Sequence, residues 1–248
     1  MIQMKNVHKR LGGKPILQGA DLFVAPGEIR SVIGRSGEGK SVLIKHVCGL
    51  MKADKGTVIV DSENITDYQE KDLFRIRKKV GLIFQYAALF DSLNVLKNVG
   101  FSLYEERKLK ESEIRDIVMH TLRQVKLGDI LDKMPSELSG GMKKRVGLAR
   151  AIVQKPKILL YDEPTSGLDP VTADAINDLI ASLAEELNAT SVVITHDMAS
   201  AFKISSHISM LLNGKVIFTG SPEETRETDN EIVQQFIQGK SVGPLSNM

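Results

Sequence analysis

The chain has 248 residues, of which 42% are apolar and 26% charged, the composition of an ordinary globular domain with at most a short appendage. Its 33 Lys and Arg residues nearly balance its 31 Asp and Glu residues, and a formal charge of +2 argues against a nucleic-acid partner. The single cysteine, Cys48, leaves no disulfide within the chain and suits a reducing compartment. The most apolar stretch, 80–90, contains Gln85 and is shorter than the roughly 20 apolar residues that a bilayer-spanning helix needs. If the protein acts at a membrane, we therefore expect it to do so through a partner chain.

The first segments along the chain are strand-like and separated by turn residues such as Gly12 and Gly13, which predicts antiparallel pairing. These segments are 2–7, 16–24 and 57–60. Short apolar runs then predict buried parallel strands. These runs are 29–33, 80–84, 158–161, 191–195 and 208–212. Helical patterns lie between several of them, and in 171–187 the apolar residues recur every three or four positions. This alternation predicts an α/β domain with a mainly parallel sheet.

Two segments depart from the alternation of strands and helices. Residues 95–124 are charged and helical in pattern, and we interpret them as a helical subdomain inserted into the α/β core. Near the end of the chain, the acidic residues between 222 and 231 predict a solvated turn. The apolar stripe that follows predicts a docking helix, and its members are Ile232, Val233, Phe236 and Ile237.

The strongest motif follows the predicted strand 29–33 and precedes a helical pattern. It matches G-x-x-x-x-G-K-[ST] at every fixed position, with the residues Gly34, Arg35, Ser36, Gly37, Glu38, Gly39, Lys40 and Ser41. Glycines allow the backbone to curve into a nest of N–H groups, and the helix N-terminus adds positive partial charge. We therefore expect a phosphate-binding loop in which Lys40 reaches the β- and γ-phosphates and the Ser41 hydroxyl binds Mg²⁺.

Two carboxylates end the apolar strand at 158–161. Asp162 occupies the position at which a Walker B carboxylate holds Mg²⁺, and Glu163 follows it, where it can accept a proton from an attacking water. A phosphate loop upstream in the same chain favours this interpretation over two solvated carboxylates.

The segment Leu138-Ser139-Gly140-Gly141-Met142 narrows the choice among phosphate-loop proteins. With it, residues 1–220 resemble the nucleotide-binding subunits of ABC transporters. Further family positions occur in order: Gln85 matches the Q-loop glutamine, the segment from Ser166 to Asp169 matches the D-loop, and His196 matches the switch histidine.

The resemblance implies an α/β fold, with the P-loop NTPase core of the ABC ATPase type, an antiparallel β subdomain and a helical subdomain inserted at about 90–155. Residues 1–220 would form this domain, and 221–248 a short extension. The resemblance also implies ATP hydrolysis with Mg²⁺ in a dimer, each ATP lying between one subunit's phosphate loop and its partner's signature.

Roles for single residues follow from the same resemblance. Glu163, His196, Gln85 and Lys40 are the implied catalytic residues. Ser41, Gln85 and Asp162 are the implied Mg²⁺ ligands. The implied nucleotide contacts beyond the phosphate loop are Ser139, Gly140, Gly141, Asp169 and Leu11.

Two positions depart from the family pattern. The family commonly has an aromatic residue where this chain has Leu11, so we expect adenine to be selected less strictly. The signature ends in Met142 instead of the usual glutamine, which leaves the phosphate contacts of Ser139 and the backbone unchanged.

The segments 88–99, 135–142 and 235–239 are similar to those of the MlaF-type ATPases of Mla and Mce lipid transport. The resemblance implies transport of lipid, with phospholipid as the first candidate, driven from the cytoplasmic face of the inner membrane. The implied partners are a second copy of the chain, MlaE-like permease subunits, an Mce-domain lipid-binding subunit and a small STAS-type subunit. The alternative is the ATPase subunit of an importer of amino acids or other small solutes, whose length and motifs are similar.

Overall fold

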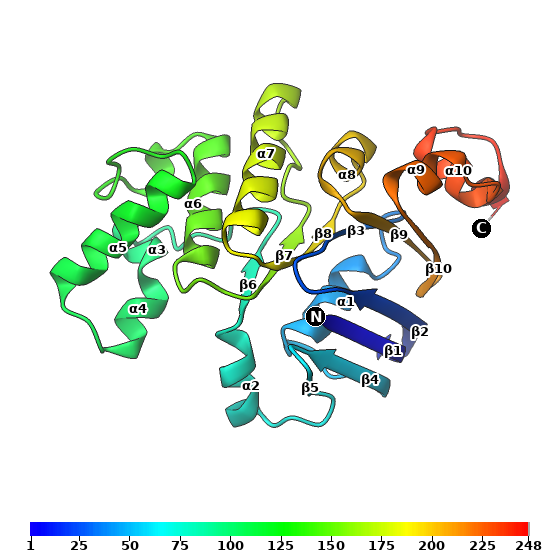
Figure 1. Cartoon of the computed structure of the whole chain (residues 1–248), viewed down its shortest axis with the longest axis horizontal. Coiled ribbons are helices and arrows are strands. Elements are labelled where there is room, and N and C mark those ends of the chain that lie inside the picture. The colour runs from blue at the N-terminus through cyan, green and yellow to red at the C-terminus, as the bar shows by residue number, and fades with distance from the viewer. Residues whose placement is uncertain (248) are drawn as a thin grey trace. The chain divides into compact units, whose positions relative to one another are not determined.

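The computed structural model describes residues 1–247, and the chain forms two compact units. The first unit joins Met1–Ile76 to Thr190–Met248, and the second is Arg77–Ala189 (Figure 1). Within residues 1–247 no helix is both long enough and apolar enough to cross a membrane.

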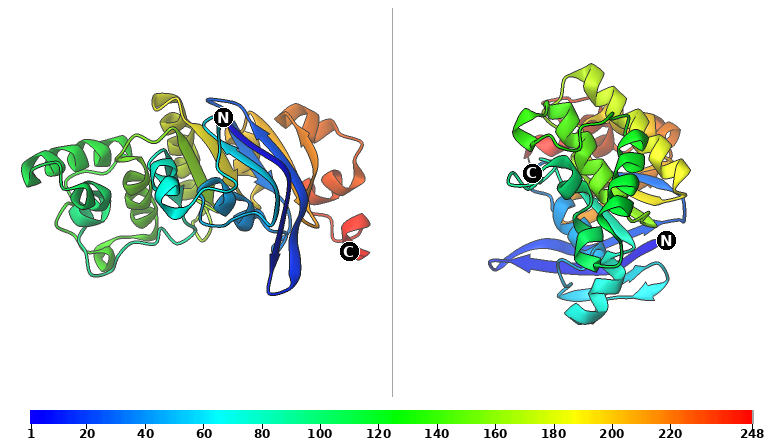
Figure 2. Two further views of the ribbon diagram at one scale, coloured as in Figure 1. Left: turned by 90° about the horizontal axis from the view of Figure 1, so that it is seen from below. Right: turned by 90° about the vertical axis from the view of Figure 1, so that its left-hand side faces the viewer.

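The first unit begins with an antiparallel sheet in the strand order β2-β1-β4-β5. Its strands are β1 (Ile2–Leu11), β2 (Lys14–Val24), β4 (Lys55–Val60) and β5 (Glu63–Asn64). The predicted antiparallel pairing of the first segments is confirmed by the registers of β1 with β2 and β4. The β1–β2 hairpin forms a long twisted ribbon, drawn in dark blue in Figure 2. The pairing of β1 with β4 shifts between Lys5 and His8, where Asn6 has a φ of 48°.

The other strands of the first unit lie in the order β10-β9-β3-β8. They are β3 (Ile29–Ile33), β8 (Thr190–Ile194), β9 (His207–Leu212) and β10 (Lys215–Gly220). β3 is parallel to both β8 and β9, as expected for apolar runs buried on both faces. β10, which the sequence did not predict, is antiparallel to β9. Helix α8 (Met198–Ile204) connects β8 to β9, α1 (Lys40–Val47) lies between β3 and β4, and α2 (Glu70–Arg77) follows β5.

The last segment of the first unit contains α9 (Pro222–Glu227), α10 (Glu231–Ile237) and a 3₁₀ turn (Pro244–Asn247). The prediction of a solvated turn at 222–231 was wrong for its first half, because α9 has a complete capping box. The Ser221 hydroxyl accepts from the Glu224 N–H at 3.1 Å, and the Glu224 carboxylate accepts from the Ser221 N–H at 2.7 Å. The predicted helix after it is confirmed as α10, whose Val233 is buried in the same apolar cluster as Ile33 and Leu245.

The second unit pairs two parallel strands, β6 (Val80–Ile83) and β7 (Ile158–Asp162). The predicted helical segment 95–124 is confirmed as three helices, α3 (Val95–Val99), α4 (Phe101–Glu106) and α5 (Glu111–Gln124). A 3₁₀ turn (Pro135–Glu137) leads into α6 (Gly140–Ile152), and α7 (Pro170–Glu186) follows β7. The apolar face predicted on 171–187 is buried on α7, with Ile176, Leu179, Ile180 and Leu183 each at most 1% exposed.

Gly56 in β4 accommodates the irregularity of β1. Its φ is +93°, and a Cβ on it would lie 2.2 Å from the main-chain oxygen of Asn6. We expect Gly56→Ala to lower the free energy of unfolding by more than about 2 kcal/mol, because a left-handed conformation costs an L-residue roughly 1–2 kcal/mol before any clash is added. Urea denaturation measures the loss. The matched control is Gly12→Ala, also at positive φ (+54°) but with open space around the new Cβ. Equal losses in the two variants would contradict the role of the close approach.

Candidate active site

The phosphate loop leaves the end of β3 through a contact that only glycine allows. Gly34 has a φ of +148°, and a Cβ on it would lie 2.3 Å from the main-chain oxygen of Leu211 in β9. Gly39 has a φ of +100° and caps the N-terminus of α1, and a Cβ there would lie 2.9 Å from the side chain of Ile16. The fixed glycines of the motif are therefore required by backbone conformation and by lack of space.

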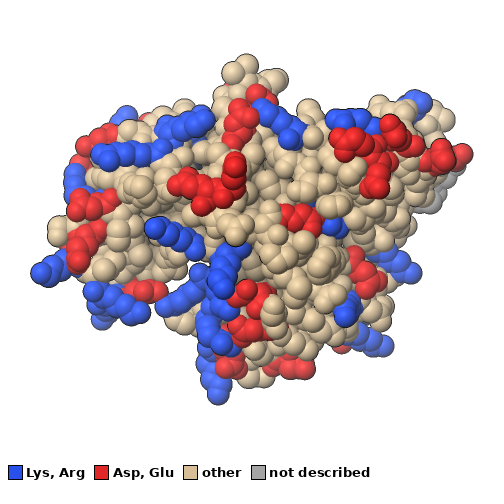
Figure 3. Space-filling view, viewed as in Figure 1, with Lys and Arg blue, Asp and Glu red and all other residues tan. Residues whose placement is uncertain are grey.

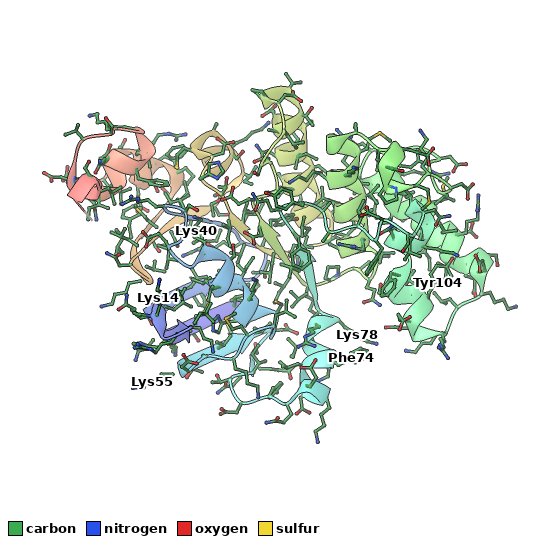
Figure 4. The ribbon with its side chains drawn as sticks, turned by 180° about the vertical axis from the view of Figure 1, so that it is seen from behind. Lys14, Lys40, Lys55, Phe74, Lys78 and Tyr104 are labelled. Atoms are coloured by element: carbon green, nitrogen blue, oxygen red, sulfur yellow. The ribbon has the colours of Figure 1, made fainter. Side chains whose placement is uncertain are left out.

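The ammonium group of Lys40 lies within the curve of the loop. Its Nζ donates to the main-chain oxygens of Gly34 at 2.7 Å and Arg35 at 2.9 Å, and the residue is 7% exposed. Figure 4 labels Lys40 at the first turn of α1. A cation at the N-terminus of a helix, beside a glycine-rich loop, forms the positive environment that phosphate groups require.

Two of the variable residues of the loop attach it to other parts of the first unit. The Glu38 carboxylate accepts from the N–H of Asn213, in the turn between β9 and β10. The Arg35 guanidinium donates to the main-chain oxygen of Leu245, in the C-terminal 3₁₀ turn, at 3.0 Å. The loop is thus held at both ends of its variable stretch.

The first unit also contains the predicted positions Leu11 and His196. Leu11 is the last residue of β1, and 39% of it is exposed. His196 lies exposed in the turn between β8 and α8. Its neighbours fix this turn, because the Asp197 N–H donates to the Thr195 hydroxyl at 2.9 Å and the Asp197 carboxylate accepts from the Ala199 N–H at 3.0 Å.

In the second unit, Gln85 and the acidic pair follow adjacent parallel strands. Gln85 comes two residues after the end of β6, while Asp162 ends β7 and Glu163 follows it with a φ of 51°. The Gln85 side-chain amide donates to the hydroxyl of Ser166 at 3.2 Å. Because the carboxyl ends of parallel strands share one edge of a sheet, the structure brings these predicted residues together.

Asp169 has a clear local role. Its carboxylate caps α7 by accepting from the N–H groups of Val171 at 3.1 Å and Thr172 at 3.0 Å. Hydrogen bonds from the side chain and main chain of Thr172 hold the pKa of Asp169 below its usual value. Its contact with nucleotide stays a prediction.

The signature segment leads directly into α6, which begins at Gly140. The Ser139 hydroxyl caps this helix by accepting from the Met142 N–H at 3.3 Å. Ser139 and Gly140 are exposed, and a Cβ on Gly141 would lie 2.8 Å from the side chain of Thr172. The start of this 13-residue helix therefore presents N–H groups to solvent, as an anion site requires.

Three residues near the site were missed by the sequence reasoning. Lys144 of α6 donates to the main-chain oxygens of Gln85 and Glu163. Arg150 of the same helix donates to the main-chain oxygens of Ala87 and Ala88, both at 2.7 Å. Asn98 of α3, fully buried, accepts from the Phe90 N–H and donates to the Phe90 oxygen. The sequence pattern that could have revealed them is a polar residue on the side of a helix that is otherwise apolar.

The predicted Mg²⁺ ligands are of the chemical kind that this ion takes at nucleotide sites, and their binding of Mg²⁺ stays a prediction. Within the described chain no group of three or more His, Cys, Asp or Glu side chains could hold a metal. Mg²⁺ at nucleotide sites typically takes one or two protein oxygens and completes its shell with phosphate oxygens and water. The hydroxyl of Ser41, the carboxylate of Asp162 and the amide oxygen of Gln85 are donors of this kind.

Comparison with known proteins assigns the family. The family described as ABC transporter matches residues 17–166. The probable ribonucleotide transport ATP-binding protein mkl of Mycobacterium leprae is 40% identical over 244 residues, which are 98% of this chain and 70% of that protein. The intermembrane phospholipid transport system ATP-binding protein MlaF of Haemophilus influenzae is 36% identical over 245 residues, 99% of this chain and 93% of that one.

A solved structure supports the same family assignment. The chain is similar to the ATP-binding cassette MJ0796 in a dimeric post-hydrolysis state bound to ADP and Pi, with a TM-score of 0.82 and 33% identity over 90% of this chain and 99% of that one. The chain belongs to the ABC transporter family. It has the ABC ATPase fold and is an ATP-binding and ATP-hydrolysing subunit, and the fold class predicted from the sequence is confirmed.

Leu11 predicts weak discrimination between nucleobases. A leucine side chain offers no π-face, and base–aromatic stacking contributes roughly 1–3 kcal/mol per base. We expect ATP and GTP to compete within about tenfold, and Leu11→Tyr to tighten ATP binding about fivefold or more. Competition binding measures both. The control is Leu109→Tyr, the same change at a residue of similar exposure in the second unit. A strong preference of the unchanged protein for ATP, with no gain in Leu11→Tyr, would contradict this role.

Proposed function

We propose that this chain drives the transport of lipids, with phospholipid as the first candidate, across a bacterial envelope. The observation that carries the proposal is the match with MlaF of Haemophilus influenzae, which spans 99% of this chain and 93% of that protein. The match includes the segment 88–99, which Arg150 and Asn98 hold by main-chain hydrogen bonds. The alternative is the ATPase subunit of an importer of amino acids or other small solutes. The matches with MlaF and mkl favour lipid transport over it, although the name of the mkl protein refers to ribonucleotides.

The catalytic roles that we propose follow the chemistry of each residue. Lys40 and the N–H groups of its loop neutralise the phosphates, and His196 contacts the γ-phosphate. Ser41, Asp162 and Gln85 would hold Mg²⁺, which would stabilise the negative charge that the transferred phosphoryl group develops. Glu163 accepts a proton from the attacking water.

We propose that two copies of the chain act together. The exposed N-terminus of α6, with Ser139, Gly140 and Gly141, then contacts the nucleotide of the partner copy, as does Asp169. The dimer seen for MJ0796 supports this arrangement. ATP favours the closed dimer, and hydrolysis with loss of phosphate reopens it. We further propose that residues 1–220 act as the nucleotide-binding domain, with about 90–155 as its helical subdomain, and that 221–248 form an extension that strengthens the dimer.

A groove of the second unit is the proposed contact with the membrane subunits. Its volume is about 400 Å³. Its lining includes the apolar side chains of Phe84, Phe90 and Phe101 together with the basic side chains of Arg77 and Lys78. All three phenylalanines are between 38% and 45% exposed, which is typical of a surface that a partner covers.

The proposed partners are MlaE-like permease subunits, an Mce-domain subunit and a STAS-type subunit, and the proposed location is the cytoplasmic face of the inner membrane. On the face shown in Figure 3, basic and acidic side chains are interspersed.

Purification of the whole membrane complex tests the cargo. The chain is captured with its membrane subunits in mild detergent, and co-purified lipid is identified by mass spectrometry. We expect a permease, an Mce-domain protein and bound phospholipid. An amino-acid-binding or nucleotide-binding subunit, with no lipid above the level of an unrelated permease complex, would favour the small-solute alternative instead.

Glu163→Gln tests the proposed base. The amide keeps the shape of the side chain but cannot accept the proton, so we expect kcat to fall by about 100-fold or more while ATP binding persists. Size-exclusion chromatography with ATP should then show a stable dimer. The control is Glu185→Gln, the same change at an exposed position of α7. Normal turnover in Glu163→Gln would remove Glu163 from this role.

A further inference from the structure

One face of α6 follows the loop that contains Gln85. Lys144, Gly147 and Arg150 are three residues apart on this helix, so they lie on the same side of it. Lys144 donates to the main-chain oxygen of Gln85, and Arg150 donates to the oxygens of Ala87 and Ala88. Between them, a Cβ on Gly147 would lie 3.1 Å from the Cβ of Ala87. Three successive positions along this side of α6 therefore contact residues 85–88.

Lys144 differs from the other two residues because it also reaches the end of β7. Its Nζ donates to the main-chain oxygen of Glu163 at 3.5 Å. One buried ammonium group thus joins the two residues that follow the parallel strands β6 and β7. Burial lowers the pKa of Lys144, and the charge of Glu163 opposes this shift.

Holding the carbonyl oxygens of Gln85 and Glu163 together requires more than one N–H donor. An ammonium group has three N–H donors, so it can serve two carbonyl oxygens at once. Two of the residues that this face of α6 contacts have left-handed backbone conformations: Glu163, bonded to Lys144, with a φ of 51°, and Ala87, bonded to Arg150, with a φ of 58°. Such conformations persist only when the surroundings determine them.

We propose that Lys144 is a positioning residue for ATP hydrolysis. Its ammonium group holds the main chains of Gln85 and Glu163, so that a movement of the signature helix α6 also moves these two residues. Ser139, which caps α6, lies five residues before it, so a displacement of the helix N-terminus moves the ammonium group as well. The inference rests on the proposed function for the roles of Gln85, Glu163 and the signature.

Three substitutions of Lys144 distinguish a positioning role in hydrolysis from a role in packing alone. Lys144→Met keeps most of the length of the side chain and removes every donor. Lys144→Gln keeps two N–H donors but removes the charge and shortens the side chain by one atom. Lys144→Arg keeps the charge and has five N–H donors. The control is Lys143→Met, the same change one residue earlier and therefore on another side of α6. Thermal unfolding, binding of a fluorescent ATP analogue, KM for ATP and kcat are measured for each.

We expect Lys144→Met to lower kcat at least tenfold while KM and analogue binding stay within about twofold, and Lys144→Arg to regain most of the loss. Lys143→Met should match the unchanged protein. If Lys144→Met does not fold, the comparison of Gln with Arg decides: a lower kcat in the Gln variant alone supports the proposal. Unchanged kcat in every folded variant, or a change in KM without one in kcat, overturns it.

The assay keeps this inference distinct from the proposed function. Basal ATP hydrolysis requires no cargo, so the identification of another cargo leaves the test intact. Glu163→Gln, measured in the same assay, reports on the proposed base itself. An inactive Glu163→Gln beside a fully active Lys144→Met would overturn the role of Lys144 alone.

Discussion

The close approach of Gly34 to the carbonyl of Leu211 is the constraint on which the phosphate loop depends. The space there is too small for any side chain, so the backbone can leave β3 and curve only with glycine at this position. Once it curves, the carbonyls of Gly34 and Arg35 lie where the Lys40 ammonium group bonds to both. The packing of two parallel strands thus determines where the cation lies. The two carbonyl acceptors also offset part of the cost of burying the Lys40 charge.

The second unit depends on one helix in a similar way. The N-terminus of α6 carries the exposed signature, and its side carries Lys144 and Arg150, which bond to the main chain of the loop after β6. Main-chain hydrogen bonds are well suited to this task, because they fix the loop without depending on its side chains. The side chain of Gln85 consequently remains available for the amide contact with Ser166.

The parts of the structure that were predictable are those encoded locally. The phosphate loop, the acidic pair after β7 and the signature each lie within a few consecutive residues, and their chemistry requires fixed spacing. Apolar runs similarly predicted the parallel strands, with ends within one or two residues of those observed, because burial on both faces demands such runs.

The features that the sequence did not predict are of two kinds. Some depend on contacts between distant segments, and one, α9, had a local sequence pattern that was interpreted as a turn. Lys144 and Gln85 are 59 positions apart, and Arg150 and Ala87 are 63 apart, so neither spacing follows a local rule. β10 has mixed burial and pairs only at an edge, so its pattern is weak. The helix α9 could have been predicted, since Ser221, Pro222 and Glu224 form a recognisable helix start, but the acidic residues suggested a turn.

The bond between Arg35 and the oxygen of Leu245 has a consequence for how such chains diverge. The phosphate motif fixes four positions and leaves four others unconstrained by nucleotide chemistry, and Arg35 is one of the latter. Here that freedom is used to attach the loop to the 3₁₀ turn at 244–247, whose backbone Gln235 also holds by accepting from the Leu245 N–H at 2.7 Å. Arg35 and the terminal segment are therefore coupled by this bond, so loss of the segment would remove one of the contacts that hold the phosphate loop.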